Sequence, residues 1–112
     1  EQACQVLAKA GLPQRIMIDA SHANSNKDYR NQPLVLDDVA RQMEGGEARI
    51  CGVMVESHLV GGRQDLVAGQ PLTYGQSITD GCIDWDTSVQ VLERLALAVR
   101  NRRKLAVQSA AA

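Results

Sequence analysis

The sequence contains few aromatic residues. They make up 3% of its 112 residues, with no phenylalanine, one tryptophan and two tyrosines. A hydrophobic core must therefore be built from Val, Leu, Ile, Ala and Met, which favours close packing of strands against helices. Such a chain also offers no aromatic platform on which nucleic-acid bases could stack. With a net charge of −1 it has no general cationic surface, and we expect neither a nucleic acid nor a membrane as its partner.

The sequence also lacks a cysteine framework and a long apolar run. Its three cysteines, Cys4, Cys51 and Cys82, are widely spaced, and no CxxC pair occurs. This pattern argues against a set of disulfides and against a structural zinc site. No signal peptide or run of membrane-spanning length is present, so we expect a cytoplasmic protein. Because residues 1–10 read as the later part of a helix and do not start with methionine, we expect the chain to be part of a longer protein.

Apolar spacing and breaker residues predict alternating helices and strands. Leu36, Val39, Ala40 and Met43 follow helical spacing, and Pro33 predicts a bend or a restart of that helix. The expected elements are a helix at 2–10, a strand at 15–19, a helix within 27–43, a strand at 49–55, a long loop at 61–75, and a helix capped by Asp84 or Asp86 that runs to about Arg103, followed by a frayed tail at 105–112.

The last helix is expected to have an apolar face and a basic cluster near its end. Val89, Leu92, Leu95, Ala96 and Val99 predict its apolar face. The basic cluster at 100–104 is typical of a solvated last helical turn, because cations are favoured near a helix C-terminus. A patch for an anion or a partner is the alternative interpretation of this cluster.

The alternation of strands and helices predicts an α/β fold with parallel strands. Both strands are apolar almost throughout, as expected for strands covered on both faces. A doubly wound sheet and a (β/α)8 barrel both fit. In either fold, ligands bind at the C-terminal ends of the strands.

Three polar residues are expected at that edge: His22 after the first strand, Glu56 at the end of the second, and Asp80 before the last helix. His22 and Glu56 are 34 residues apart, close to one βα repeat of roughly 30 residues. One imidazole and two carboxylates suit a divalent metal such as manganese, iron, cobalt or zinc. A metal would also compensate a carboxylate that follows a buried apolar run. The alternative is a hydrogen-bonded structural acid and a capping histidine.

Other residues near these positions receive plainer interpretations. We read His58 as a surface histidine or a group behind the ligands, and Cys82 as a small buried thiol more than a soft ligand. We expect Asp19 to orient a neighbour. The pairs Ser21–His22 and Ser57–His58 resemble nucleophile–base pairs, but no nucleophile-elbow motif accompanies them.

Four long motifs in order carry a resemblance to a known family: residues 18–25 (IDASHANS), 45–47 (GGE), 52–59 (GVMVESHL) and 71–80 (PLTYGQSITD). They closely resemble the C-terminal part of type I 3-deoxy-D-arabino-heptulosonate-7-phosphate (DAHP) synthases, also called 3-deoxy-7-phosphoheptulonate synthases. The resemblance runs from before Arg15 to about Arg103.

The resemblance implies a transferase of the shikimate pathway, which leads to the aromatic amino acids. Members of this family condense phosphoenolpyruvate with erythrose 4-phosphate in a (β/α)8 barrel and use a divalent metal. The resemblance makes residues 1–104 the C-terminal part of one barrel domain, with its seventh and eighth strands, and makes His22, Glu56 and Asp80 metal ligands and catalytic residues.

The resemblance also implies an incomplete site. The family's fourth metal ligand is a cysteine near the first strand, and its phosphate-binding arginines and lysines lie on earlier strands; we find no match for the cysteine and no strong candidate for the phosphate clamp. We therefore expect the isolated chain to be inactive. Because part of a barrel leaves apolar sheet edges open, and such edges favour pairing with another chain, we also expect self-association into a homo-oligomer. A non-catalytic metal-binding or self-associating module is the alternative.

Overall fold

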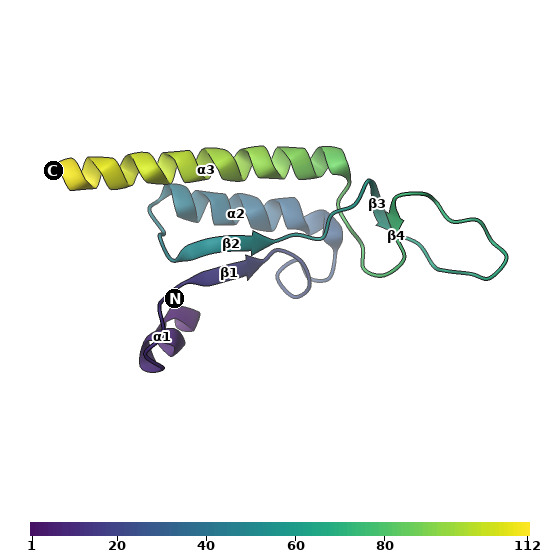
Figure 1. The fold of residues 1–112 in the computed structure, drawn as a ribbon, viewed down its shortest axis with the longest axis horizontal. Coiled ribbons are helices and arrows are strands. Elements are labelled where there is room, and N and C mark those ends of the chain that lie inside the picture. Colours follow the sequence, from purple (N-terminus) through teal and green to yellow (C-terminus); the bar gives the residue numbers. More distant parts are fainter.

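Two parallel strands and the helix between them form the centre of the structure. The computed structural model describes all 112 residues. Its elements are α1 (Gln2–Lys9), β1 (Ile16–Asp19), the 3-10 helix η1 (Tyr29–Asn31), α2 (Gln32–Glu44), β2 (Ile50–Met54), β3 (Val60–Arg63), β4 (Gln76–Ser77) and α3 (Trp85–Ala111) (Figure 1). The α/β class and the order of the main elements are confirmed.

β1 and β2 pair in parallel, as the alternation of strands and helices predicts. Ile16 lies opposite Ile50, and Asp19 lies opposite Met54. Both strands therefore end at the same edge of the sheet, and the segments that follow them start side by side (Figure 1). This arrangement brings His22 and Glu56 together.

The hydrophobic core lies where α2, α3 and one face of the strands meet. α2 contributes the stripe predicted from the sequence, and Ile50 and Ile83 complete the contact from the strand and loop side. α2 and α3 run along the same side of the strands (Figure 1). The buried hydrophobic cluster consists of Ala20, Leu36, Val39, Ala40, Met43, Ile50, Ile83, Val91, Leu95 and Ala98.

The predicted apolar face of α3 is partly wrong. The residues that α3 buries are Ser88, Val91, Leu95 and Ala98, whereas Leu92 and Val89 are exposed. Val91, Leu95 and Ala98 pack into the core on this face, and Arg94 donates to Asp37 and Glu44 of α2. Ser88 lies on the same buried face and donates from Oγ to the backbone oxygen of Asp84. The side chain of Asp84 caps the helix by accepting from the amide of Thr87.

Pro33 lies at the start of α2. Of the two predictions for this proline, a bend or a restart of the helix, the structure shows the restart. The proline lies in the first turn, where a missing backbone N–H leaves no hydrogen bond unmade. The preceding 3-10 turn is capped by Asp28, which accepts from the amide of Arg30. The 3-10 helix and α2 together fill the segment expected to be one helix.

The expected loop at 61–75 is bounded by a short parallel pair: β3 overlaps its first residues, and β4 follows directly after it. Sequence periodicity missed it because side-chain amides replace part of the strand ladder. The amide of Gln64 donates to Thr73 and Gln76, and that of Gln76 donates to Gly61. This pair extends away from the helices as a separate lobe (Figure 1).

The tail expected to fray is helical. α3 continues through 105–111, because these residues contain good helix formers and neither glycine nor proline. The basic cluster therefore lies inside the helix and is not its last turn. Within it, Arg102 is half-buried and donates to the backbone oxygens of Glu47 and Ile50. None of the helices combines the length and the apolarity that crossing a membrane requires.

Candidate metal centre

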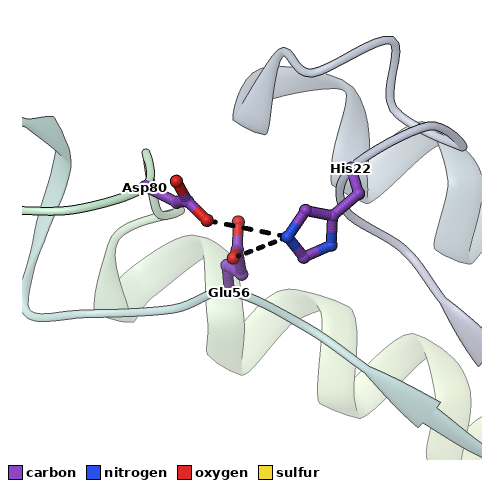
Figure 2. Close-up of side chains that lie close together, drawn as sticks. All are labelled: His22, Glu56 and Asp80. Atoms are coloured by element: carbon purple, nitrogen blue, oxygen red, sulfur yellow. Dashed lines mark ion pairs between the residues drawn. The ribbon is translucent and has the colours of Figure 1, made fainter.

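His22, Glu56 and Asp80 meet at the C-terminal edge of β1 and β2. They come from three separate segments: the loop after β1, the residues just beyond β2, and the turn before α3 (Figure 2). One ligand atom from each residue lies within 4.8 Å of the other two. The structure thus brings together all three residues that the sequence singled out.

The distances within this cluster suit a shared ion better than direct hydrogen bonds. Nε2 of His22 lies 3.5 Å from Oε1 of Glu56 and 3.6 Å from Oδ2 of Asp80. Hydrogen bonds between such atoms are shorter, at about 2.7–3.2 Å. Ligand atoms about 2.1 Å from one tetrahedral metal are about 3.4 Å apart. The two separations from Nε2 of His22 are close to this value, and all three ligand atoms lie within 4.8 Å of one another, so the side chains present fit a divalent ion.

The loop after β1 holds His22 in an uncommon backbone conformation. His22 has a φ of 47°, in the left-handed region. Its carbonyl oxygen accepts from the amide of Lys27 at 2.7 Å and from Oγ of Ser25 at 3.2 Å. Asn24 closes the loop by donating to the backbone oxygen of Asp19 at 2.7 Å. These bonds from Asn24 and Ser25 hold the loop that carries His22.

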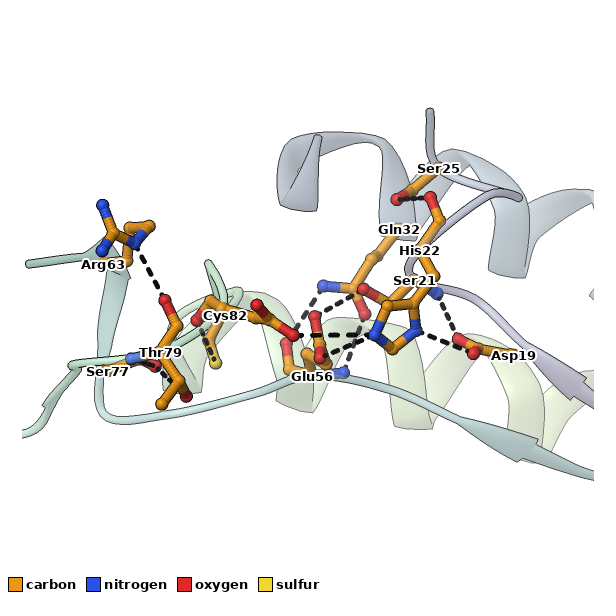
Figure 3. A network of polar contacts seen from close by, with 11 residues as sticks. Asp19, Ser21, His22, Ser25, Gln32, Glu56, Arg63, Ser77, Thr79 and Cys82 are labelled. Atoms are coloured by element: carbon orange, nitrogen blue, oxygen red, sulfur yellow. Dashed lines mark hydrogen bonds and ion pairs between the residues drawn. The ribbon is translucent and has the colours of Figure 1, made fainter. Parts of the chain in front are cut away.

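Asp19 orients His22, as predicted. Its Oδ2 lies 2.9 Å from Nδ1 of His22, and its Oδ1 accepts from the amide of Ser21 at 2.8 Å (Figure 3). The hydrogen bond to Asp19 raises the pKa of His22, and the same bond lowers the pKa of Asp19. With Nδ1 bound to Asp19, Nε2 is the nitrogen that faces Glu56 and Asp80.

The other candidate residues take structural roles. His58 lies outside the cluster on the surface, where its Nδ1 accepts from the amide of Leu59. Cys82 is buried, and this burial raises the pKa of its thiol, which keeps it protonated. Ser21 bonds to Glu56, and Ser57 contacts Ser88. Neither serine pairs with the neighbouring histidine, so the nucleophile–base interpretations fail.

The cluster opens into a cavity of about 700 Å³ that also contains three cations which sequence analysis missed. Arg30 is paired with Asp28 through two hydrogen bonds, and Arg63 donates to Asp65 and to the backbone oxygen of Thr79. Lys27 forms no ion pair. Lys27 comes from the loop after β1, Arg30 from η1 and Arg63 from β3, and only the fold places them beside the metal ligands.

Buried polar residues behind the cluster were also missed. Ser21 and Gln32 are buried, and both bond to Glu56. Their only signal in the sequence was their position: Ser21 directly precedes His22, and Gln32 directly precedes Pro33 at the start of a helix.

A parallel βα arrangement with chemistry at the strand ends defines an α/β protein of the kind that binds ligands at that edge. Comparison with known proteins then places the chain more narrowly. Residues 1–93 match the DAHP synthetase I family. The chain belongs to this family, as its motifs predict.

Individual relatives agree. The chain is 57% identical over 97 residues to the Phe-sensitive phospho-2-dehydro-3-deoxyheptonate aldolase of Escherichia coli K12, covering 87% of this chain and 28% of that protein. It is 49% identical over 108 residues to the corresponding aldolase of Corynebacterium glutamicum, covering 90% of this chain and 30% of that protein.

A solved structure gives the same result. The phospho-2-dehydro-3-deoxyheptonate aldolase of Francisella tularensis SCHU S4 superposes with a TM-score of 0.85 at 46% identity, covering 90% of this chain and 29% of that one. The chain thus spans less than a third of the length of these relatives. Their names support the synthase interpretation and give the non-catalytic module no support.

Proposed function

We propose that this chain supplies the metal-binding part of the active site of a 3-deoxy-7-phosphoheptulonate synthase, which joins phosphoenolpyruvate to erythrose 4-phosphate. The observation that carries the proposal is the convergence of His22, Glu56 and Asp80 at one strand edge, in a chain of this family. The relatives are named as aldolases of the heptulonate product, which fits formation of a carbon–carbon bond between two phosphorylated substrates.

The three side chains offer one nitrogen and two oxygen ligands to a divalent ion, and manganese, iron, cobalt and zinc are the candidates. Glu56 and Asp80 offer one carboxylate oxygen each, and His22 offers Nε2. When bound, such an ion supplies a Lewis acid that can polarise the aldehyde oxygen of erythrose 4-phosphate. Asp19 keeps the imidazole turned so that Nε2 points to this site.

The charge of the cavity favours an anionic substrate once a metal is present. Lys27, Arg30 and Arg63 are balanced by three carboxylates that line the same cavity, so these six side chains carry no net charge. A divalent ion would change their sum to +2, which matches a phosphate dianion. Of the three cations, Lys27 is the one available to contact it, because Arg30 and Arg63 are each paired with a carboxylate.

We further propose that β1 and β2 are the seventh and eighth strands of a barrel. A complete barrel of this type has eight parallel strands in about 250 residues. In this chain β1 and β2 form a sheet of only two strands. The remaining strands would supply the phosphate clamp and a further ligand, so the chain alone should give no turnover with both substrates and manganese.

Manganese binding to the purified chain tests the proposal. We expect calorimetry to show binding that is lost in His22→Ala, Glu56→Ala and Asp80→Ala. His58→Ala is the matched control, since this second histidine lies outside the cluster and should bind manganese as the unchanged chain does. Binding that survives all three ligand substitutions would contradict the proposed site. Steady turnover by the chain alone would contradict the proposal that other strands are needed.

A further inference from the structure

Gln32 is a polar side chain in the most buried part of the molecule. It begins α2 and is 0% exposed, among the largest fully buried side chains of the chain. A buried amide costs free energy unless its donor and acceptor are both satisfied. Both atoms of the Gln32 amide are satisfied by one residue. Oε1 accepts from the backbone N–H of Glu56 at 2.8 Å, and Nε2 donates to the backbone oxygen of Glu56 at 3.1 Å (Figure 3).

These two bonds take the place of strand pairing. The ladder between β1 and β2 ends with Ala20, whose amide donates to Met54. Glu56 lies two residues further on and has no β1 residue opposite it. Its carbonyl oxygen accepts a second bond from the amide of Ile83, in the segment that carries Asp80. The backbone of Glu56 is therefore fixed between α2 and the turn before α3.

The side chain of Glu56 is fixed as well. Ser21, which is 4% exposed, donates from Oγ to Oε2 of Glu56 at 2.5 Å. This bond occupies one carboxylate oxygen and leaves Oε1 toward Nε2 of His22. Ser21 is itself held, because its amide donates to Asp19. A carboxylate restrained in this way loses little conformational entropy when it binds an ion.

We propose that Gln32 and Ser21 are positioning residues for Glu56: Gln32 fixes its backbone and Ser21 selects which carboxylate oxygen faces the metal site. Neither side chain is among the ligand atoms of the cluster. The inference rests on the proposed metal site for its consequence in function, whereas the hold on Glu56 exists without a metal. Partners of this kind behind metal ligands typically contribute 10–100-fold to metal affinity.

The experiment compares four variants of the full chain. Gln32→Met keeps the length of the side chain and removes both bonds, Gln32→Glu keeps an acceptor for the N–H of Glu56 but no donor for its oxygen, and Ser21→Ala removes the hydroxyl. Val39→Ala, in the same helix and also buried, is the control for lost stability alone. The readouts are manganese affinity and hydrogen exchange of the Glu56 amide without metal.

We expect Gln32→Met to lose about 10–100-fold in manganese affinity, Gln32→Glu to lose less, and Ser21→Ala to fall in the same range. Val39→Ala should lose stability and keep its affinity. Affinity within about twofold of the unchanged chain in both Gln32→Met and Ser21→Ala would overturn the proposal. If Gln32→Met does not fold, Gln32→Glu and Ser21→Ala decide between these outcomes.

Hydrogen exchange separates this proposal from the proposed function. If the unchanged chain binds no manganese, the metal site fails, but the hold on Glu56 is still measured. Faster exchange of the Glu56 amide in Gln32→Met than in Val39→Ala then supports the positioning role. Equal exchange in the two variants overturns it.

Discussion

Oδ2 of Asp19 lies 2.9 Å from Nδ1 of His22, at the end of the strand that leads into the site. A hydrogen bond at Nδ1 decides which imidazole nitrogen carries the proton in the neutral ring. Here it leaves the lone pair on Nε2, the atom that lies between Glu56 and Asp80. Asp19 therefore acts on the metal site through His22 and does not join the cluster itself.

Replacing Asp19 should weaken metal binding without removing a ligand. We expect Asp19→Ala to bind manganese about 10–100-fold more weakly, because the imidazole loses its fixed tautomer and orientation. Asp19→Asn keeps an oxygen acceptor for Nδ1–H and should retain more affinity. Titration calorimetry measures both. Asp38→Ala, which removes an exposed carboxylate on α2, is the control and should leave the affinity unchanged. An unchanged affinity in Asp19→Ala would contradict the role assigned to Asp19.

The features of the fold that sequence reasoning predicted are those that depend on local pattern. The apolar runs of β1 and β2, the stripe on α2 and the cap at Asp84 follow from spacing and residue type. Parallel pairing then places the residues after the two strands at one edge, so the proximity of His22 and Glu56 follows from the sequence pattern alone. Asp80 follows no strand; it was predicted from its place before the last helix, and the family motif then supported it.

The features that sequence reasoning missed depend on contacts between distant residues. The amide of Gln32 reaches the backbone of a residue 24 positions away, and no local pattern indicates such a bond. α3 has two apolar stripes, and the one that packs, with Val91, Leu95 and Ala98, is seen only with the contacts to α2, which include the bonds from Arg94 to Asp37 and Glu44. β3 and β4 pair through side-chain amides and glycines, which carry no strand signal.

Acid should destabilise the opposite end of the sheet. Arg49, just before β2, donates from Nε and Nη2 to Glu47 at 2.8 and 2.7 Å. The hydrogen bonds from Arg49 lower the pKa of Glu47 from its usual 4.5 to about 2. Because the folded pKa is the lower one, the ionised pair stabilises the fold above the usual pKa, and this stability is lost as the pH falls toward about 2.

The measurement is the free energy of unfolding in urea at several pH values. Glu47→Gln should be less stable than the unchanged chain at neutral pH, and the difference between them should shrink as the pH falls below 4.5. Glu93→Gln, at an exposed glutamate of α3, should follow the unchanged chain throughout. A difference between Glu47→Gln and the unchanged chain that stays constant down to about pH 2 would rule out the pairing with Arg49 as its cause.

Gly75 should tolerate no side chain. Its φ is +79°, and an added Cβ would lie 2.9 Å from Cβ of Leu59. The left-handed conformation alone costs a non-glycine residue about 1–2 kcal/mol, and the contact with Leu59 adds to it. Gly69 has a similar φ of +77° with no atom within 4 Å of the added Cβ, so it isolates the backbone cost.

We therefore expect Gly75→Ala to loosen the β3–β4 lobe more than Gly69→Ala does. The amide of Val60 donates to the oxygen of Gly75, so its hydrogen exchange reports on this contact directly. Exchange at Val60 should be faster in Gly75→Ala than in Gly69→Ala. Equal exchange in the two variants would mean that Leu59 moves aside without cost.

We predict that the chain self-associates through the face of the β1–β2 sheet that no helix covers. α2 and α3 cover one face, while Met17 lies over Gly52 on the other and is 64% exposed. Each strand also has one edge without a partner strand. Unpaired edges beside an apolar face favour pairing with another chain, and a second copy of this chain offers the same face and edges. We expect sedimentation velocity to detect a species heavier than the 12.1 kDa chain, in proportions that rise with concentration.

A charge on this face should oppose the association. Met17→Lys places an ammonium group where the second copy would pack, so its sedimentation should shift toward the monomer. Val107→Lys makes the same change at a similarly exposed position, 69% exposed near the end of α3, and should leave the distribution unchanged. If both variants dissociate alike, net charge and not the sheet face controls the assembly. If the unchanged chain remains a monomer at every concentration, the open sheet is stable in water by itself, and the expected homo-oligomer is wrong for this chain.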